Sequence, residues 1–169
     1  HGGPKAKTSP YRTGRRFGRE EMKHLREALD QNTLSYHKGE KVQQFCREFA
    51  AKYGRKYAIA CTSGTAAIHV ALCAAGVTAG DEVITSVLTD AGGVIPTLYQ
   101  NAVPIFADID PRTYNVTAET IEARITPRTK AILVVHLAGN PAEMDPIVRL
   151  ARRRKIHLIE DCAQTWNGF

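Results

Sequence analysis

Metal-binding and disulfide motifs are absent from this sequence of 169 residues. Its four cysteines (Cys46, Cys61, Cys73 and Cys162) are widely spaced, with neither a CxxC pair nor a Cys/His cluster. A zinc site or a disulfide framework therefore has no support in the sequence, and we expect no metal ion in a functional site. Reduced thiols are typical of the cytoplasm, which is the location that we expect.

Long apolar segments are also missing. No run approaches the ~18 residues that are needed to cross a bilayer, and the first residues contain no apolar signal core. We therefore expect no membrane partner. With 43% hydrophobic and 24% charged residues, the composition is that of an ordinary globular protein.

Positive charge is concentrated near the N-terminus. The chain has 23 Lys and Arg against 17 Asp and Glu; residues 1–54 hold 12 basic and 6 acidic residues, and residues 55–169 hold 11 of each. Without a nucleic-acid motif or an aromatic stripe, this excess predicts a solvated surface or an arm against a partner subunit, not a nucleic-acid site. The basic run 152–155 is expected to end a helix that Asp145 caps.

The hydrophobic pattern divides the chain into two regions, 1–54 and 55–169. The first combines an arm rich in Gly, Pro and basic residues (1–17) with helical patterns at 19–30 and 40–53. In the second, short apolar runs alternate with helical stretches, which predicts an α/β fold, a three-layer α/β/α arrangement around a mostly parallel sheet. Strands are expected at 57–61, 82–87, 103–107, 131–136 and 156–160, and helices at 64–75, 92–100, 117–125 and 146–154.

The first candidate site is the segment TSGT at 62–65, between an expected strand and an expected helix. Gly64 permits close approach of a ligand to the backbone, and the free N–H groups of the helix start, with the hydroxyls of Ser63 and Thr65, suit a phosphate. The segment matches neither GxxxxGK[ST] nor GxGxxG, so a P-loop ATPase or a dinucleotide enzyme is poorly supported. The alternative interpretation is an ordinary helix cap.

The second candidate is EDCAQ at 160–164, at the end of an apolar strand. A carboxylate in this place suits a protonated ring nitrogen, and the alternative is a surface Asp that caps the next turn. Because ligands of parallel sheets bind at the carboxyl ends of the strands, the two segments together indicate a phosphorylated heteroaromatic cofactor. Pyridoxal 5'-phosphate (PLP) has one phosphate and one pyridine nitrogen and fits both.

The sequence resembles the DegT/DnrJ/EryC1/StrS family of PLP-dependent aminotransferases, from about Phe17 to Gln164. The resemblance implies the N-terminal part of the large PLP-binding domain of the aspartate aminotransferase-like fold, with an incomplete domain at 55–169. The matching segments occur in the same order as in the family: TSGTAAIHVAL at 62–72, GDEVI at 80–84, PIFADID at 104–110, RTKAI at 128–132, HLAGNPAEM at 136–144 and EDCAQ at 160–164.

The resemblance also implies roles for individual residues. Ser63, Gly64 and Thr65 would hold the PLP phosphate, and Asp161 would pair with the pyridine nitrogen and keep it protonated. Ala163 would pack on one face of the ring, and Gln164 would lie near the ring hydroxyl. His136 is interpreted as a structural residue that forms hydrogen bonds, not as a catalytic one.

The sequence departs from the family pattern at two positions. Asp90 stands where the family carries an aromatic residue that stacks on the second face of the ring, so the cofactor contact there is different. Trp166 stands where a small residue or His is usual. The Schiff-base lysine of the family lies beyond the 160–164 segment, and no lysine of this chain takes its place, which leaves the catalytic residue unknown.

The family resemblance implies an aminotransferase that transfers an amino group from Glu or Gln to a keto-sugar, nucleotide-linked in most members, or to a keto-cyclitol. It also implies a homodimer. Two alternatives remain at this point. One is a PLP- or pyridoxamine-phosphate-dependent sugar dehydratase of the same family, in which His replaces the lysine. The other is a non-catalytic fragment or binding module.

Overall fold

The computed structural model describes Pro4 and residues 17–165. Most of the expected N-terminal arm and Trp166 lie outside these residues. The described chain forms two compact units, one up to Ala60 and one from Cys61 onward. No helix of the described residues is long and apolar enough to cross a membrane.

The N-terminal unit contains two helices, α1 (Arg19–Asp30) and α2 (Glu40–Lys52), and both confirm the helical patterns. The side-chain oxygen of Gln31 accepts the backbone N–H of Glu40 at 2.6 Å and connects the end of α1 to the start of α2. Apolar side chains of α1, including Leu25 and Leu29, remain exposed.

The prediction of a strand at 57–61 was wrong. These residues are described and form no strand, and Tyr57 and Ile59 are largely exposed. The run Tyr-Ala-Ile-Ala-Cys has a strand-like composition, but a strand is stable only beside another strand, and no described strand pairs with this segment.

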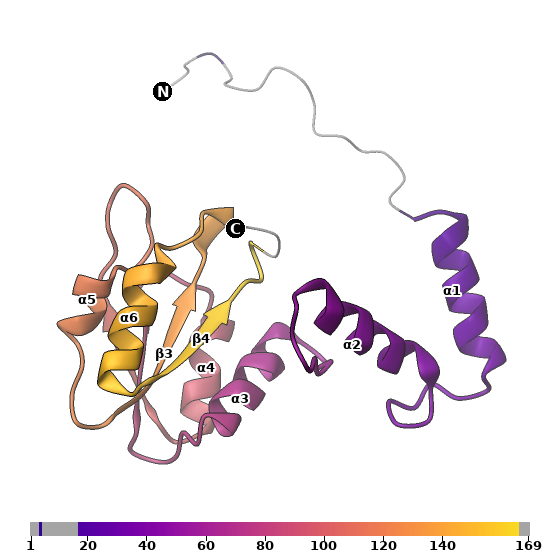
Figure 1. Ribbon diagram of the computed structural model, residues 1–169, viewed down its shortest axis with the longest axis horizontal. Helices are drawn as coiled ribbons and strands as arrows, with labels where there is room; N and C mark the ends of the chain where they lie inside the picture. Colours follow the sequence, from indigo (N-terminus) through magenta and orange to yellow (C-terminus); the bar gives the residue numbers. More distant parts are fainter. Residues whose placement is uncertain (1–3, 5–16, 166–169) are drawn as a thin grey trace. The chain divides into compact units, whose positions relative to one another are not determined.

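The C-terminal unit is built on a parallel sheet of four strands (Figure 1). The strand order is β2-β1-β3-β4. The chain therefore passes from β1 to β2 on one side of β1, and then crosses to β3 on the other side. Central strands β1 and β3 are almost wholly buried, as their continuous apolar runs predict. The strands are β1 (Glu82–Ser86), β2 (Val103–Ala107), β3 (Thr129–Val135) and β4 (His157–Asp161).

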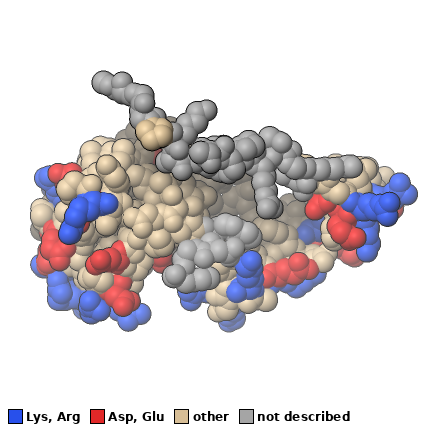
Figure 2. Space-filling view, turned by 90° about the horizontal axis from the view of Figure 1, so that it is seen from above, with Lys and Arg blue, Asp and Glu red and all other residues tan. Residues whose placement is uncertain are grey.

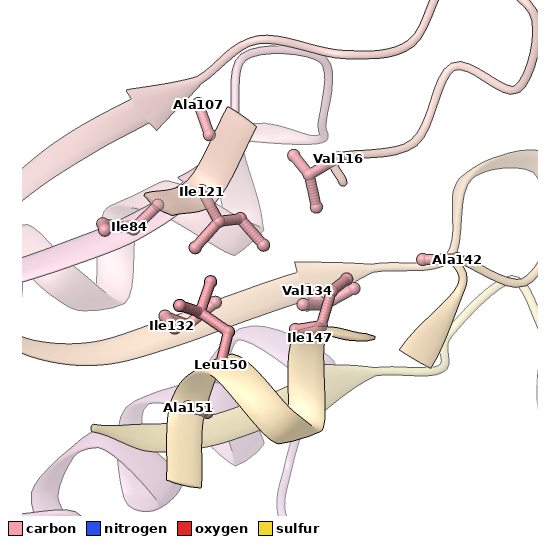
Figure 3. Close-up of a cluster of buried hydrophobic side chains, with 10 residues drawn as sticks. All are labelled: Ile84, Ala107, Val116, Ile121, Ile132, Val134, Ala142, Ile147, Leu150 and Ala151. Atoms are coloured by element: carbon pink, nitrogen blue, oxygen red, sulfur yellow. The ribbon is translucent and has the colours of Figure 1, made fainter. Parts of the chain in front are cut away.

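Helices cover both faces of this sheet, which confirms the three-layer arrangement. Alternate residues of β3 point to opposite faces. Leu133 packs with α3 (Gly64–Ala74), against which α4 (Ala91–Tyr99) lies. On the other face, α5 (Ala118–Glu122) and α6 (Met144–Arg154) cover the sheet. Figure 3 shows this second core, whose members are Ile84, Ala107, Val116, Ile121, Ile132, Val134, Ala142, Ile147, Leu150 and Ala151.

Helix α6 ends as expected but begins differently. Its N-cap is Glu143, so Asp145 lies inside the first turn, where its charge still complements the helix dipole. The basic residues at 152–154 form the last turn, again with favourable dipole alignment. Arg153 and Arg154 both contact Glu122 of α5, at 3.0 and 2.8 Å. Figure 2 shows Lys and Arg interspersed with Asp and Glu on the face that it draws, which suits a solvated surface.

A buried carboxylate stabilises the amino-terminal end of the sheet. Glu82 begins β1 and is 2% exposed. The hydroxyl of Thr126 donates to one of its oxygens, and the Arg128 guanidinium donates to the other at 2.5 Å. The Thr126 hydrogen bond, and then Arg128, hold the pKa of Glu82 below its ordinary value. This group lies at the opposite end of β1 from the candidate site.

Candidate active site

A cavity of about 310 Å³ opens at the carboxyl ends of the strands. It lies where β1 and β3 end and the chain leaves them in opposite directions, which is where parallel sheets bind ligands. Six of the seven predicted cofactor residues line it together, and Ser63 does not. The lining consists of Gly64, Thr65, Ile68, Thr89, Asp90, Gly92, Gly93, Val135, Asp161, Ala163 and Gln164.

The start of α3 forms one wall of the cavity. Ser63 is the N-cap of this helix, and its Oγ accepts the backbone N–H of Ala66 at 3.0 Å. Its hydroxyl oxygen therefore accepts one of the free backbone N–H groups of the helix start and fixes the position of the first turn. A Cβ atom added at Gly64 would meet no atom within 4 Å, so the backbone here borders open space. Such an exposed helix start, with no acidic residue in its first turn, suits an anion.

The start of α4 packs against Thr65. A Cβ atom on Gly92 would lie 2.7 Å from Thr65 Oγ1, which is too close for a real contact, and 3.0 Å from Asp90 Oδ1, which is tight. The absence of a side chain at Gly92 therefore lets the two helix starts meet at the cavity. Sequence reasoning missed this residue. Its only signal was a Gly-Gly pair inside a helix, where glycine is unfavourable.

Asp90 has a structural role in this arrangement. It is the N-cap of α4, and its Oδ1 accepts the backbone N–H of Gly92 at 2.7 Å. The residue is exposed and lines the cavity, so a carboxylate stands where the family resemblance implies a ring. It supplies a hydrogen-bond acceptor and a negative charge to this wall.

Asp161 is the last residue of β4 and lines the same cavity. Its Oδ1 accepts the N–H of Ala163 at 3.0 Å, which closes a tight turn after the strand. The side-chain oxygen of Gln164 accepts the N–H of Ala138 at 2.5 Å, so this side chain is held by the loop that follows β3. Burial, and then Glu160 and Asp161, raise the pKa of the Cys162 thiol, which disfavours a reactive thiolate between the two segments.

Next to this turn, three atoms of types that can bind a metal ion lie within 4.8 Å of one another; they belong to His136, Glu160 and Cys162. The hydrogen bonds of the ring argue against a metal ion. Nδ1 of His136 accepts the N–H of Ala142 at 3.1 Å, so a neutral ring carries its proton on Nε2, the atom that faces Glu160 at 3.2 Å. A histidine that binds a metal donates its other N–H to an acceptor, and here that nitrogen faces a donor.

The donor set fits PLP. A helix start that presents N–H groups and the Thr65 hydroxyl faces one part of the cavity, and the Asp161 carboxylate lines another. Gly92 keeps this cradle free of a Cβ atom. The sequence profile of the DegT/DnrJ/EryC1/StrS aminotransferase family matches residues 16–167. This chain belongs to that family. Its fold is the α/β fold of the PLP-dependent aminotransferases.

By their names, two relatives are involved in polysaccharide biosynthesis and in the amination of an inosose. The chain is 45% identical over 147 residues to the spore coat polysaccharide biosynthesis protein SpsC of Bacillus subtilis, covering 87% of this chain and 37% of that protein. It is 36% identical over 173 residues to a putative L-glutamine:3-amino-2,3-dideoxy-scyllo-inosose aminotransferase of Streptoalloteichus tenebrarius, covering 99% and 42%. The chain thus spans about two fifths of the length of these relatives.

Solved structures of family members have the same fold. An aminotransferase from Psychrobacter cryohalolentis is 40% identical, with a TM-score of 0.87 over 94% of this chain and 40% of that one. A GDP-4-keto-6-deoxymannose-3-dehydratase is 31% identical, with a TM-score of 0.78 over 88% of this chain and 40% of that one. The family fold therefore accompanies both amino transfer and dehydration.

Proposed function

We propose that this chain forms the cofactor-binding part of a PLP-dependent aminotransferase that acts on a keto-sugar or keto-cyclitol, with Glu or Gln as the amino donor. The observation that carries the proposal is the cavity that joins the start of α3 to the Asp161 carboxylate. A phosphate and a protonated pyridine nitrogen are the two groups that such walls would bind. The names of the inosose aminotransferase and of the GDP-4-keto-6-deoxymannose-3-dehydratase support the class of acceptor.

When bound, PLP supplies an electron-accepting ring to which an amino group can be attached and removed. The residues of this chain hold that ring. The N–H groups at the start of α3 and the Thr65 hydroxyl bind the phosphate and fix its position. The Asp161 carboxylate keeps a proton on the pyridine nitrogen, and this positive charge stabilises negative charge that develops on the substrate carbon. Ala163 and Gln164 limit where the ring can lie.

Sugar dehydration remains the second candidate function, because a dehydratase is 31% identical to this chain over the matched region and has the same fold. The two reactions differ in whether a Lys or a His moves the proton, and none of the described lining residues of the cavity is either. A binding module without catalysis is the third possibility and would bind the cofactor only by non-covalent contacts.

We also propose a cytoplasmic homodimer. All four cysteines are free, which suits a reducing compartment. The apolar side chains of α1 support an association, since Met22, Leu25 and Leu29 are each about 60% exposed or more. Sedimentation velocity tests this: we expect twice the monomer mass, and a species of 18.6 kDa at all concentrations would refute it.

Titration with pyridoxamine 5'-phosphate (PMP), which needs no lysine to bind, tests the cofactor site. We expect binding that inorganic phosphate competes with, and a loss of about tenfold or more in Asp161→Asn, because the partner of the ring nitrogen loses its charge. Asp108→Asn is the matched control. Asp108 is exposed, and its Oδ1 also accepts a nearby backbone N–H, that of Ile109. Equal PMP affinity in both variants would refute the assignment of Asp161.

Incubation with PLP followed by borohydride reduction and peptide mapping tests the catalytic class. One modified lysine at a single position, together with release of a keto acid from the amino donor, supports an aminotransferase. Binding without a specific adduct supports a dehydratase or a binding module, and added keto-sugar that loses water distinguishes the dehydratase from the binding module.

A further inference from the structure

His136 follows β3 directly and is 4% exposed, although neither the cavity lining nor the family roles include it. Both of its ring nitrogens are engaged. The backbone N–H of Ala142 donates to Nδ1 at 3.1 Å, and Nε2 lies 3.2 Å from Oε2 of Glu160. A buried histidine with a partner on each nitrogen is held in one orientation.

These contacts select one tautomer. Because Ala142 presents a donor, Nδ1 must offer its lone pair, and the ring proton resides on Nε2. Nε2–H then donates to the Glu160 carboxylate. A proton on Nδ1 would place two N–H groups against each other, so this geometry requires the neutral Nε2–H form.

The backbone of the same residue holds the segment that carries Asp161. The N–H of His136 donates to the carbonyl of Asp161 at 3.3 Å, and the carbonyl of His136 accepts the hydroxyl of Thr165 at 3.1 Å. Thr165 is buried, and its N–H closes a turn onto the carbonyl of Cys162. His136 therefore contacts this turn at both of its ends.

The side chain of His136 adds the remaining constraint. Glu160 and Asp161 are consecutive in β4, so their side chains point to opposite faces of the sheet. Val134 is the strand partner of Glu160 and belongs to the core under α6, whereas Val135, the partner of Asp161, lines the cavity. A hydrogen bond to Glu160 on one face thus restrains the orientation of Asp161 on the other.

We propose that His136, as the neutral Nε2–H tautomer, is a positioning residue that acts through Glu160 and Thr165 to aim the Asp161 carboxylate at the ring nitrogen of the cofactor. The inference rests on the proposed function. The proposal gives the two parts of the cavity separate roles. His136 governs the affinity for the pyridine ring, and the start of α3 governs the affinity for the phosphate.

The test compares the affinities of each variant for PMP and for inorganic phosphate. His136→Asn keeps an acceptor for Ala142 but removes the donor to Glu160. We expect about a tenfold loss of PMP affinity with phosphate affinity unchanged. His157→Asn, at the exposed start of β4, is the matched control and leaves both affinities unchanged. Equal losses of PMP and phosphate affinity would show a merely structural role and overturn the proposal.

Two further measurements keep the proposal testable if His136→Asn folds poorly. In the wild-type protein, nitrogen NMR is expected to show the proton of His136 on Nε2, and a proton on Nδ1 would overturn the inference. In an Asp161→Asn background, removal of the acceptor by Glu160→Ala is expected to cause no additional loss of PMP affinity, because the pair acts through Asp161. If the wild type itself does not bind PMP, the proposed function fails, whereas the NMR result still tests the tautomer.

Discussion

Thr65 Oγ1 lies 2.7 Å from the point where a Cβ atom of Gly92 would stand. Thr65 belongs to the first turn of α3 and Gly92 to the first turn of α4, so this contact joins the two helix starts that border the cavity. The position of the Thr65 hydroxyl therefore depends on a glycine that is 27 residues away in the sequence. The approach of the two helix starts at this wall depends on the absence of a side chain at Gly92.

Gly92→Ala is expected to weaken PMP binding by about tenfold with little change in stability. Alanine favours a helix interior by about 1 kcal/mol and the first turn by less, which offsets part of the ~1–3 kcal/mol that overpacking costs. Thr65 relieves the clash by turning its hydroxyl away, and the phosphate then loses that donor. Isothermal titration and urea unfolding measure the two effects separately.

The double variant Thr65→Ala/Gly92→Ala is the control for this mechanism. Once the Thr65 hydroxyl is absent, the added methyl group no longer displaces a donor to the phosphate, so Gly92→Ala is expected to cause no further loss of affinity. Losses that add in the double variant would show that Gly92 acts on some other group.

Substitution of Asp90 is expected to separate its capping role from its charge. Asp90→Asn keeps an N-cap acceptor for Gly92 and leaves the free energy of unfolding nearly unchanged, whereas Asp90→Ala costs about 1 kcal/mol. Because the carboxylate and the Thr65 hydroxyl line the same wall, removal of the negative charge is expected to strengthen the binding of a phosphate.

The corresponding measurement is the affinity for inorganic phosphate at low and high salt. We expect Asp90→Asn to bind a few-fold more tightly than the wild type at low salt, with the difference reduced at high salt by screening. A weaker affinity in Asp90→Asn would show that the carboxylate itself contributes a favourable contact.

Asn115→Ala is expected to destabilise the protein by about 2 kcal/mol. Asn115 is buried; its amide donates to the carbonyl of Asn140 at 2.9 Å, and its side-chain oxygen accepts the N–H of Leu137 at 3.1 Å. Truncation leaves both backbone groups without this partner. Asn140→Ala, at an exposed position of the loop that Asn115 contacts, is the matched control and is expected to cost less than half as much. Urea unfolding measures both, and equal losses would contradict the argument.

The sequence predicted the centre of the sheet well because β1 and β3 are buried on both faces. Continuous apolar runs, such as that of β3, identify such strands without knowledge of their neighbours. The segment from Tyr57 to Cys61 has the same local character, but strand formation also requires a partner, which is a property of the whole fold. The helical periodicity of the sequence predicted α1 correctly, because a helix forms its backbone hydrogen bonds within one segment and needs no partner strand.

The sequence predicted those candidate-site residues whose chemistry suits a cofactor and which directly follow a strand or begin a helix. Gly64 and Asp161 were identified because each lies at the edge of the sheet where ligands bind. Gly92 was missed because its importance arises only when α3 and α4 meet. For Ser63, the sequence left two roles open, and the structure assigns its Oγ to the N–H of Ala66. Because Oγ accepts this bond, the hydroxyl proton of Ser63 is still available to a ligand.

Glu82 is expected to make the stability of the protein depend on acidity. The Thr126 hydroxyl and the Arg128 guanidinium bind the ionised form, so the pKa of Glu82 is lower in the folded than in the unfolded protein, where it is near 4.5. As pH falls below 4.5, the unfolded state takes up a proton before the folded state does. The stabilising contribution is therefore complete above this pH and is lost as pH falls through the lower folded-state pKa.

Urea unfolding between pH 7 and pH 3 tests this dependence on Glu82. The free energy of unfolding of the wild type is expected to fall more steeply with acid than that of Glu82→Gln, in which the group cannot titrate. Thr126→Val removes the larger cause of the shift and is expected to move the loss to higher pH, toward the ordinary range. Glu143→Gln, at an exposed carboxylate, is the control and should retain the wild-type slope. Parallel curves for the wild type and Glu82→Gln would show that the buried carboxylate does not control acid stability.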